Sequence, residues 1–456
     1  MGETADRRLT LLVTTIASFL VPYMGSSINI ALPSIGREFS MNAISLSWVA
    51  ASFILAAAMS LLPLGRIADL YGRKRIFTWG TLTYAISSLL SAVSPSADAL
   101  IFSRVLQGVG GAMIFSTAIA ILTSVFPAGE RGRVLGINVA SVYLGLSLGP
   151  FLGGFLTQHL GWRGIFFVNV PLGVAIWLLV TVKLQGEWAG ARKEKFDLTG
   201  CVIYSLTLFA IMYGLSLLPD PSGAQFILIG ALGLLAFLKW EGKVKSPVLD
   251  INLFKRSTVF AFSNLAALIN YSATFAVAFL LSLYLQYIKG LGPQNAGLIL
   301  VCQPLAQAIF SPLAGRLSDR IEPRIVASLG MALTVVGLIL FTLLTANTGM
   351  GFIVGSQILL GLGFALFSSP NTNAVMRGVD ARRYGVASAI LGTMRLIGQM
   401  LSMGIAMSAF ATKMGKVPIG SGNSLLFLGS VKATFLIFAC LCSGGIFASL
   451  ARGRVR

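Results

Sequence analysis

The chain has 456 residues, of which 56% are hydrophobic and only 11% are charged, and its mean hydropathy is +0.85. A soluble domain carries about 25% charged residues, so this composition excludes an ordinary soluble protein. The net charge of +19 does not indicate nucleic-acid binding, because the basic residues fall in short segments between apolar runs, where they encode orientation in a membrane.

Long apolar runs divide the chain into fourteen expected transmembrane helices. Each run has the length of about 20 residues that crosses the hydrocarbon core of a bilayer. An even number of helices places both termini on the same side. The helices are expected near residues 9–31, 45–64, 76–93, 98–126, 133–157, 164–183, 198–218, 223–240, 258–287, 295–316, 325–346, 350–376, 384–411 and 432–451.

The distribution of basic residues predicts which side the termini occupy. Of the 34 Lys and Arg residues, 26 fall in segments on the side of the N-terminus and six on the opposite side, while Arg104 and Arg395 lie within helices. Cytoplasmic segments carry the excess of Lys and Arg. We therefore expect an all-α, multi-pass protein of the cytoplasmic (inner) membrane with both termini in the cytoplasm.

A short motif occurs twice, each time after the second helix of a group of six. GRIADLYGRK begins at Gly65 and GRLSDRIEPR begins at Gly315, which places Asp319 in register with Asp69. Related halves around a central site are a common transporter plan, and we expect both copies to act in gating. The expected divisions are an N-terminal six-helix bundle over residues 1–184, linkers and two inserted helices over 185–257, and a C-terminal six-helix bundle over 258–456.

The first copy of the motif is dense in charge, although the surrounding chain has almost none. Gly65 and Gly72 permit a tight turn and close approach of another helix. Asp69 can cap a helix N-terminus or pair with Arg73, which Lys74 follows. The stretch resembles the signature between helices 2 and 3 of the major facilitator superfamily, roughly G-x-L-[AS]-D-[RK]-x-G-R-[RK]. The alternative is an ordinary positively charged inner loop.

The fourth expected helix carries RVLQGVGGA, which begins at Arg104. An arginine within a membrane must face the bundle interior or water, and Gln107 lies one turn along the helix. The run resembles the R-x-x-Q-G signature of the same superfamily, which implies a role in coupling or in the cavity. The alternative is that Arg104 extends to the outer surface, because Asp98 marks that end only about two turns away.

The fifth expected helix carries GLSLGPFLGG, which begins at Gly145. Gly145, Gly149 and Gly153 recur every four residues and form a smooth face, and Pro150 permits a kink. Together with Gly154, the run resembles the G-x-x-x-G-P-x-x-G-G signature that marks exporters within the superfamily. The alternative is ordinary packing of small residues, which is common in membrane bundles.

Two further motifs narrow the resemblance. GWRGIFFVNVPLG, residues 161–173, and SSINIALPSI, residues 26–35, are similar to segments of the fourteen-helix drug:proton antiporter branch. Many members of that branch carry an Asp in helix 1 at the position of Met24. None of the 15 acidic residues here is expected at mid-membrane, so the usual group for proton coupling is missing.

The candidates to line a substrate cavity are basic, neutral polar, aromatic or sulfur-containing side chains within the expected helices. Besides Arg104 and Arg395 they are Tyr23, Met24, Asn29, Tyr143, Asn270, Tyr271, Gln303, Gln307, Asn371 and Gln399. For any neutral polar member, an interhelical hydrogen bond is the alternative role. Such a cavity offers no counter-ion to a cationic drug but would offer one to an anionic or zwitterionic amphiphile.

The sequence as a whole predicts a secondary exporter of amphiphilic organic compounds or drugs that works by alternating access. The resemblance implies proton coupling; the alternative is an exporter of an anionic or zwitterionic metabolite or lipid-like compound without an embedded carboxylate for that coupling. An enzyme is not expected, because the sequence has no evident nucleophile–base pair or phosphate loop. We expect a monomer without cofactor or metal, whose partners are the substrate, membrane lipid and protons, and not nucleic acid.

Overall fold

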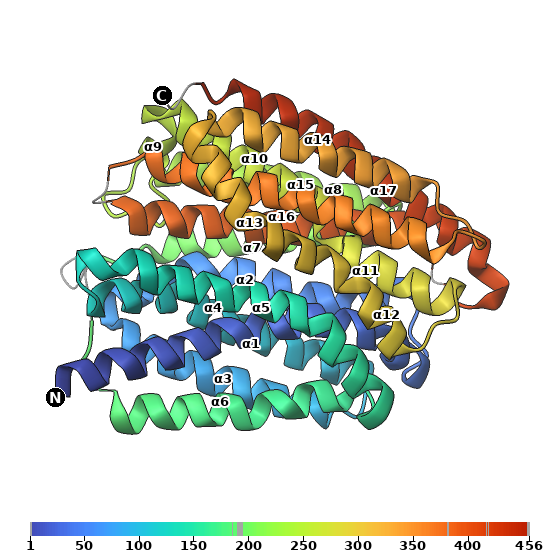
Figure 1. The fold of residues 1–456 in the computed structure, drawn as a ribbon, viewed down its shortest axis with the longest axis horizontal. Coiled ribbons are helices and arrows are strands. Elements are labelled where there is room, and N and C mark those ends of the chain that lie inside the picture. Colours follow the sequence, from blue (N-terminus) through green and yellow to red (C-terminus); the bar gives the residue numbers. More distant parts are fainter. Residues whose placement is uncertain are drawn as a thin grey trace.

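The computed structural model describes residues 2–184, 186–188, 195–380, 383–415, 417 and 419–453. Six basic residues used to predict the orientation lie outside the described residues: Arg192, Lys193, Arg382, Lys416, Arg454 and Arg456. The described part is all-α, as expected, and contains no strand. Its long helices run side by side, and the two termini lie at the same end of the bundle (Figure 1).

The first six helices match the expected runs, and we call them the N-terminal helix group. Asn42 caps the second of them by accepting a hydrogen bond from the Ser45 backbone N–H at 2.8 Å. Only Gly72 separates the end of the second helix from the beginning of the third. The helices are α1 (Gly2–Glu38), α2 (Ala43–Tyr71), α3 (Arg73–Ala92), α4 (Ala97–Val125), α5 (Ala128–Leu160) and α6 (Arg163–Lys183).

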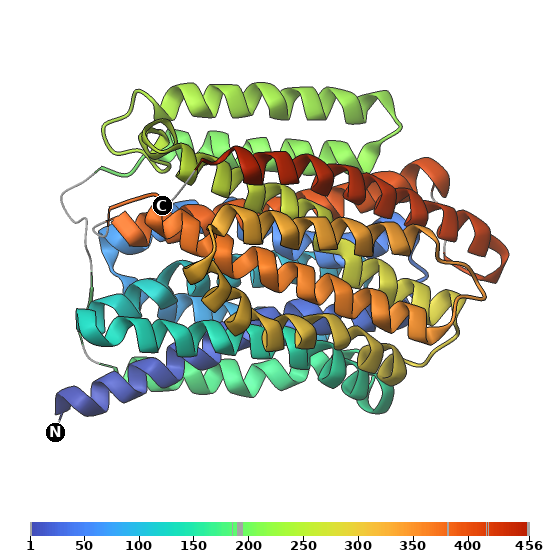
Figure 2. The ribbon, with the colours of Figure 1, turned by 45° about the horizontal axis from the view of Figure 1, so that its top comes forward.

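The two inserted helices, α7 (Leu198–Leu217) and α8 (Pro221–Glu241), form a pair at one edge of the bundle (Figure 2). Tyr204 of α7 donates its hydroxyl to the Ala58 backbone oxygen of α2 at 2.9 Å. A short helix, α9 (Ile251–Arg256), follows them.

The remaining elements form the C-terminal helix group. The expected helix near 258–287 consists of three consecutive pieces that make one run, and the expected helix near 295–316 consists of two. The elements are α10 (Thr258–Thr274), α11 (Ala276–Leu283), the π-helix η1 (Tyr284–Ile288), α12 (Pro293–Leu300), α13 (Cys302–Arg320), α14 (Pro323–Thr342), α15 (Met350–Arg377), α16 (Tyr384–Lys413), the 3₁₀ helix η3 (Ser421–Asn423) and α17 (Ser424–Ala451).

Thirteen helical runs of the described residues are long and apolar enough to cross a membrane. The expected span that is missing from these thirteen is α3. It has 20 residues, but serine, threonine and glycine lower its apolar content. It nevertheless packs against neighbours that qualify, since a Cβ added at Gly173 of α6 would lie 2.9 Å from the Cβ of Ala85 in α3. The number of fourteen spans stays a prediction.

Glycine pairs create the same close contact in both helix groups. A Cβ at Gly80 of α3 would lie 3.2 Å from the Gly110 oxygen of α4, and a Cβ at Gly330 of α14 would lie 2.6 Å from the Gly363 oxygen of α15. Without side chains at these positions, the backbones of neighbouring helices can approach closely. The two groups therefore repeat one packing arrangement.

Candidate functional site

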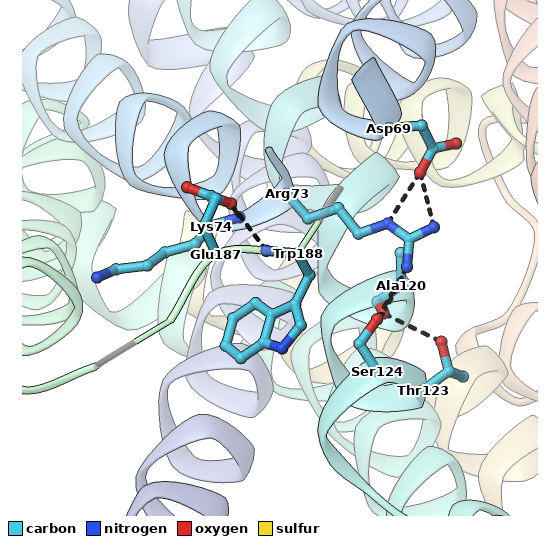
Figure 3. Close-up of polar contacts among 8 residues, drawn as sticks. All are labelled: Asp69, Arg73, Lys74, Ala120, Thr123, Ser124, Glu187 and Trp188. Atoms are coloured by element: carbon cyan, nitrogen blue, oxygen red, sulfur yellow. Dashed lines mark hydrogen bonds and ion pairs between the residues drawn. The ribbon is translucent and has the colours of Figure 1, made fainter. Parts of the chain in front are cut away.

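The first copy of the repeated motif forms the junction between α2 and α3. The Arg73 guanidinium donates to Asp69 Oδ1, from Nε at 2.8 Å and from Nη2 at 2.7 Å. Its Nη1 donates to Ser124 Oγ of α4 at 2.9 Å and to the Ala120 backbone oxygen at 3.3 Å (Figure 3). Arg73 thus joins the ends of three helices and holds Asp69 within the N-terminal helix group.

The two glycines of this motif differ in what they permit. A Cβ at Gly65 would lie 3.5 Å from the Cβ of Ser116, an ordinary contact, so this position is not crowded. Gly72 has φ of +125°, a conformation that favours glycine. Lys74 Nζ donates to the backbone oxygen of Leu184, just after α6.

The second copy of the motif repeats the ion pair with a different partner. Asp319, near the end of α13, lies 3.7 Å from the Arg377 guanidinium at the end of α15. Gly315 is tighter than its counterpart, because a Cβ there would lie 3.2 Å from Ser369 Oγ. In both copies an aspartate therefore pairs with an arginine of its own helix group.

Arg104 lies inside the N-terminal helix group and is only 1% exposed. Its Nε donates to the Val49 backbone oxygen of α2 at 3.1 Å, and Nη1 donates to Gln107 Oε1. Gln107 Nε2 in turn donates to Ser88 Oγ of α3 at 2.8 Å, and the Phe53 ring lies 4.5 Å from Arg104 Cζ. Arg104 and Gln107 therefore join α2, α3 and α4, and Arg104 does not extend to the outer surface.

The glycine face of α5 packs against α1. A Cβ at Gly145 would lie 2.5 Å from the Phe19 oxygen, one at Gly149 would lie 2.9 Å from the Tyr23 oxygen, and one at Gly153 would lie 2.8 Å from Ser27 Cα. The predicted smooth face thus exists, and α1 is the helix that it brings close.

A different face of α5 meets the C-terminal helix group. A Cβ at Gly154 would lie 2.6 Å from the Pro293 oxygen of α12, and a Cβ at Gly297 would collide with the Pro150 oxygen. At the same end of the molecule, Ser282 of α11 donates to the Asn29 backbone oxygen of α1 at 2.6 Å. Pro150 and Gly154 therefore lie at a contact between the two groups.

Polar side chains gather where α5 meets α10, α15 and α16. Tyr143 of α5 lies with its hydroxyl 3.4 Å from Ser368 Oγ of α15. Arg395 Nη2 of α16 donates to Thr372 Oγ1 of α15 at 2.7 Å, and Arg395 Cζ lies 5.6 Å from the Tyr271 ring of α10. Buried Arg395 Nε has no hydrogen-bond partner among the described residues. We call these five residues the inter-group cluster.

The cavity candidates on α1 lie apart from this cluster. Tyr23 is buried and stacks on Phe19 at 5.6 Å between ring centroids. Met24 is fully buried, and its sulfur accepts a hydrogen bond from Asn169 Nδ2 of α6 at 3.3 Å. Met24, at the position where the resemblance led us to expect an acid, therefore packs against α6 here.

The candidates on α10 to α16 have diverse surroundings. Asn270 is buried, and neither of its side-chain polar atoms has a hydrogen-bond partner in the described structure. Gln307 is buried and Gln303 half-buried on α13, where the Gln303 backbone oxygen faces Gly361. Gln399 is half-buried one turn after Arg395 on α16, and this spacing places it on the same helix face.

Asn371 belongs to a buried network that the sequence did not reveal. Its Oδ1 accepts from Arg452 Nη1 at 3.1 Å, and its Nδ2 donates to the Ser263 oxygen of α10 at 3.1 Å. Arg452 Nε also donates to the Ser449 oxygen at 2.8 Å. Burial lowers the pKa of the Arg452 guanidinium to about 10. Sequence position alone placed Arg452 in a charged terminal segment, so no pattern pointed to this role.

The comparison with family models matches two stretches that together cover most of the chain. The model of the Major Facilitator Superfamily matches residues 14–248 and 263–454. The chain belongs to the Major Facilitator Superfamily. It is therefore a multi-pass membrane transporter and not an enzyme.

Two relatives within the superfamily illustrate its range. The chain is 32% identical to the multidrug resistance protein Stp of Mycobacterium tuberculosis over 88% of this chain and 76% of that protein. It is 27% identical to the riboflavin transporter RibZ of Clostridioides difficile over 97% of this chain and 96% of that protein. Among solved structures, the peptide transporter POT, crystallised as a mutant with sulfate, aligns with a TM-score of 0.70 at 14% identity, over 95% and 93% of the two chains. That likeness shows the shared fold.

Proposed function

We propose that this transporter exports amphiphilic organic compounds across the cytoplasmic membrane by alternating access. The glycine–proline run of α5 supports this direction, because it resembles the exporter signature. The similarity to a protein named for multidrug resistance supports the substrate class.

The inter-group cluster is the observation that carries the proposal. Arg395, Tyr271 and Tyr143 come from different helices and meet between the two groups. A guanidinium beside the Tyr271 ring, together with the Tyr143 hydroxyl, can bind an amphiphile through charge, hydrogen bonds and ring stacking. No carboxylate of the described residues lies within ion-pairing distance of Arg395, so its charge is available to cargo.

The arrangement in the membrane forms part of the proposal. We propose fourteen spans, with α3 as the one of lower apolar content, and both termini in the cytoplasm. The proposed units are the bundles 1–184 and 258–456, with the segment 185–257 inserted between them, and the chain acts as a monomer surrounded by lipid. The bias of basic residues supports this orientation.

The proposed gate uses both copies of the repeated motif. In the other conformational state, Asp69 would leave Arg73 and bind across to the C-terminal helix group at the end that carries the termini. The N-cap of α16 is Arg383, whose side chain forms no capping hydrogen bond, so this helix end offers N–H groups to an anion. Asp319 and Gly315 would have the corresponding role in the C-terminal helix group.

Proton coupling is proposed without the usual acid. Each acidic side chain of the described residues outside the N-terminal segment lies near a helix end or between helices. A proton could then be carried by a peripheral group or by the cargo itself. The alternative that we retain is export of an anionic or zwitterionic metabolite or lipid-like compound without such coupling.

Transport by the purified protein in proteoliposomes tests the proposal. We expect amphiphiles to accumulate in protein-containing vesicles under an imposed proton gradient, and not in protein-free vesicles. Equal accumulation with and without the proton gradient would favour the uncoupled alternative. Absence of transport across a panel of cationic, neutral and anionic amphiphiles would contradict the function.

A second candidate is transport of riboflavin or a similar planar metabolite. The observation that favours it is the overlap with RibZ along 97% of this chain, together with the two tyrosines of the inter-group cluster, on which a planar ring system could stack. Uptake of labelled riboflavin in the same vesicles distinguishes it from drug export.

A further inference from the structure

The linker after α6 contacts the first turn of α3 through three backbone N–H groups. Arg73 N donates to the Trp188 oxygen at 2.8 Å, Lys74 N to Glu187 Oε1 at 2.9 Å, and Arg75 N to Glu187 Oε2 at 3.2 Å. In Figure 3, Glu187 lies beside Lys74, and Asp69 lies on the other side of Arg73. A segment far along the sequence therefore covers the beginning of α3.

These contacts satisfy groups that α3 cannot satisfy from its own sequence. The first N–H groups of a helix have no intrahelical partner, and an N-cap side chain usually accepts from one of them. The N-cap of α3 is Gly72, which has no side chain, and its first turn contains three basic residues and no acid. The carboxylate of Glu187 supplies both the acceptor and the negative charge that a helix N-terminus favours.

Gly72 leaves the space that the Glu187 carboxylate occupies. A Cβ at Gly72 would lie 2.5 Å from Glu187 Oε1 and 2.8 Å from Glu187 Cγ. A side chain at position 72 would therefore have to displace the carboxylate from the two N–H groups. The glycine of the motif therefore makes room for the cap as well as for the turn.

Arg73 connects this cap to the proposed gate. Its backbone N–H is held by the linker, and its guanidinium is held by Asp69, Ser124 and the Ala120 oxygen. A displacement of the first turn of α3 would change the position of the guanidinium relative to Asp69, because the same residue makes both sets of contacts.

We infer that Glu187 is a positioning residue for transport: it caps α3 from the linker and thereby sets where Arg73 holds Asp69. This inference rests on the proposed gating role of Asp69. Glu187 favours the state of this structure, in which Asp69 stays within its own helix group. Loss of the cap releases Asp69 and shifts the population toward the state closed at the end that carries the termini.

The linker is well placed for this role because both of its flanks are anchored to the same helix group. The linker begins after α6 at Leu184, whose backbone oxygen accepts a hydrogen bond from Lys74 Nζ of α3. It is followed by α7, in which the Tyr204 hydroxyl donates to the Ala58 oxygen of α2. α7 also contacts α16, since Ser408 Oγ donates to the Leu215 oxygen at 2.8 Å. α7 therefore contacts both helix groups.

The test compares Glu187→Ala, Glu187→Gln and Glu187→Asp with a control, Glu130→Ala. Glu130 is an exposed acid in the first turn of α5, so its removal reports a general charge effect. Spin labels at Gly132 of α5 and Tyr384 of α16, in a chain without its native cysteines, measure the separation of the two groups. Loss of a cap changes an equilibrium by about fivefold.

For Glu187→Ala we expect the population with short label distances to rise about fivefold and the maximal transport rate to fall, with the apparent affinity for substrate unchanged. Glu187→Asp should have label distances and a transport rate close to those of the wild type, because it keeps the carboxylate. The values for Glu187→Gln should lie between those of the wild type and Glu187→Ala. A folded Glu187→Gln and Glu187→Ala with wild-type distances and rates would overturn the inference.

The same measurements separate this inference from the proposed function. If the distances respond to Glu187→Ala while no amphiphile is transported by the wild type, the cap is supported and the export function is wrong. If Asp69→Asn changes the distances and transport but the Glu187 variants do not, the gate is supported and the cap has no positioning role. If Glu187→Ala does not fold, the near-isosteric Glu187→Gln decides through the label distances alone.

Discussion

The hydroxyl of Ser27 in α1 donates to the backbone oxygen of Gly149 in α5 at 2.8 Å. This hydrogen bond lies within the stretch where the glycine face of α5 contacts the α1 backbone. Gly149 thus contributes both the space and the acceptor, and the backbones of the two helices can approach closely.

Gly149→Leu should abolish transport. A side chain at this position would displace α1 from α5, and inserting bulk into a well-packed contact costs about 1–3 kcal/mol or more. Gly136→Leu on the same helix is the matched control, because a Cβ at Gly136 would have no atom within 4 Å. Transport and thermal stability of both variants provide the measurement, and full activity in Gly149→Leu would show that this contact does not need a glycine.

Asp69→Asn should weaken transport while the protein remains folded. An anion at a helix N-terminus contributes about 0.3–2 kcal/mol, so the equilibrium between the two gate states should shift by about twofold to thirtyfold. Asp98→Asn is the control, since Asp98 is an exposed acid in the first turn of α4. Unchanged transport at normal expression in Asp69→Asn would exclude the gating role.

The sequence predicted the helices well because apolar length and charged interruptions determine them locally. The pair between Asp69 and Arg73 could also be predicted from the sequence. A spacing of four residues brings the two side chains together across the end of one helix and the start of the next. The glycine face of α5 was predicted for the same reason, because it depends only on the period of the helix.

Contacts between helices could not be predicted in the same way. The sequence placed Arg104 and Asn371 at plausible depths, but it did not say which neighbour each faces, and both lie within networks of a single helix group. Glu187 binds a backbone N–H that is 113 residues away, and no local pattern connects the two segments. Only the missing cap at Gly72 hinted that a partner was needed.

Arg452→Ala should destabilise the C-terminal helix group. It would leave Asn371 Oδ1 and the Ser263 hydroxyl without a donor, and each buried group left unsatisfied costs about 1–3 kcal/mol. Because the lowered pKa of Arg452 is still about 10, the side chain is charged at neutral pH. The contribution of Arg452 to the free energy of unfolding should therefore be constant between pH 5 and 8. The free energy of unfolding should rise with pH only above about pH 10, between the lowered pKa and the ordinary pKa of arginine.

The measurement for Arg452 is the melting temperature in detergent, with the exposed Lys255→Ala as control. A melting temperature equal to the wild type would mean that water replaces the guanidinium in this network. A strong change in the effect of Arg452→Ala between pH 5 and 8 would contradict the pKa argument.

We expect Arg395 to decide the charge of the cargo. Arg104 is enclosed by the Val49 oxygen, Gln107 and Phe53. Arg395 contacts Thr372 and the Tyr271 ring, and its Nε has no hydrogen-bond partner among the described residues. A hydrogen bond to a charged group contributes about 1.5–3 kcal/mol, and 1.4 kcal/mol corresponds to a factor of ten in affinity. Arg395→Gln should therefore weaken binding of anionic or zwitterionic amphiphiles by about tenfold to a hundredfold.

Binding of a panel of cationic, neutral and anionic amphiphiles to wild type, Arg395→Gln and Arg104→Gln checks this prediction. Arg104→Gln should reduce thermal stability, because it breaks contacts among α2, α3 and α4, and it should leave the charge preference of the remaining folded protein unchanged. Tight binding of cations that Arg395→Gln does not alter would contradict the anion preference. The aromatic rings of Tyr271 and Tyr143 would then be the groups that bind a cation, through the attraction between a positive charge and the face of a ring.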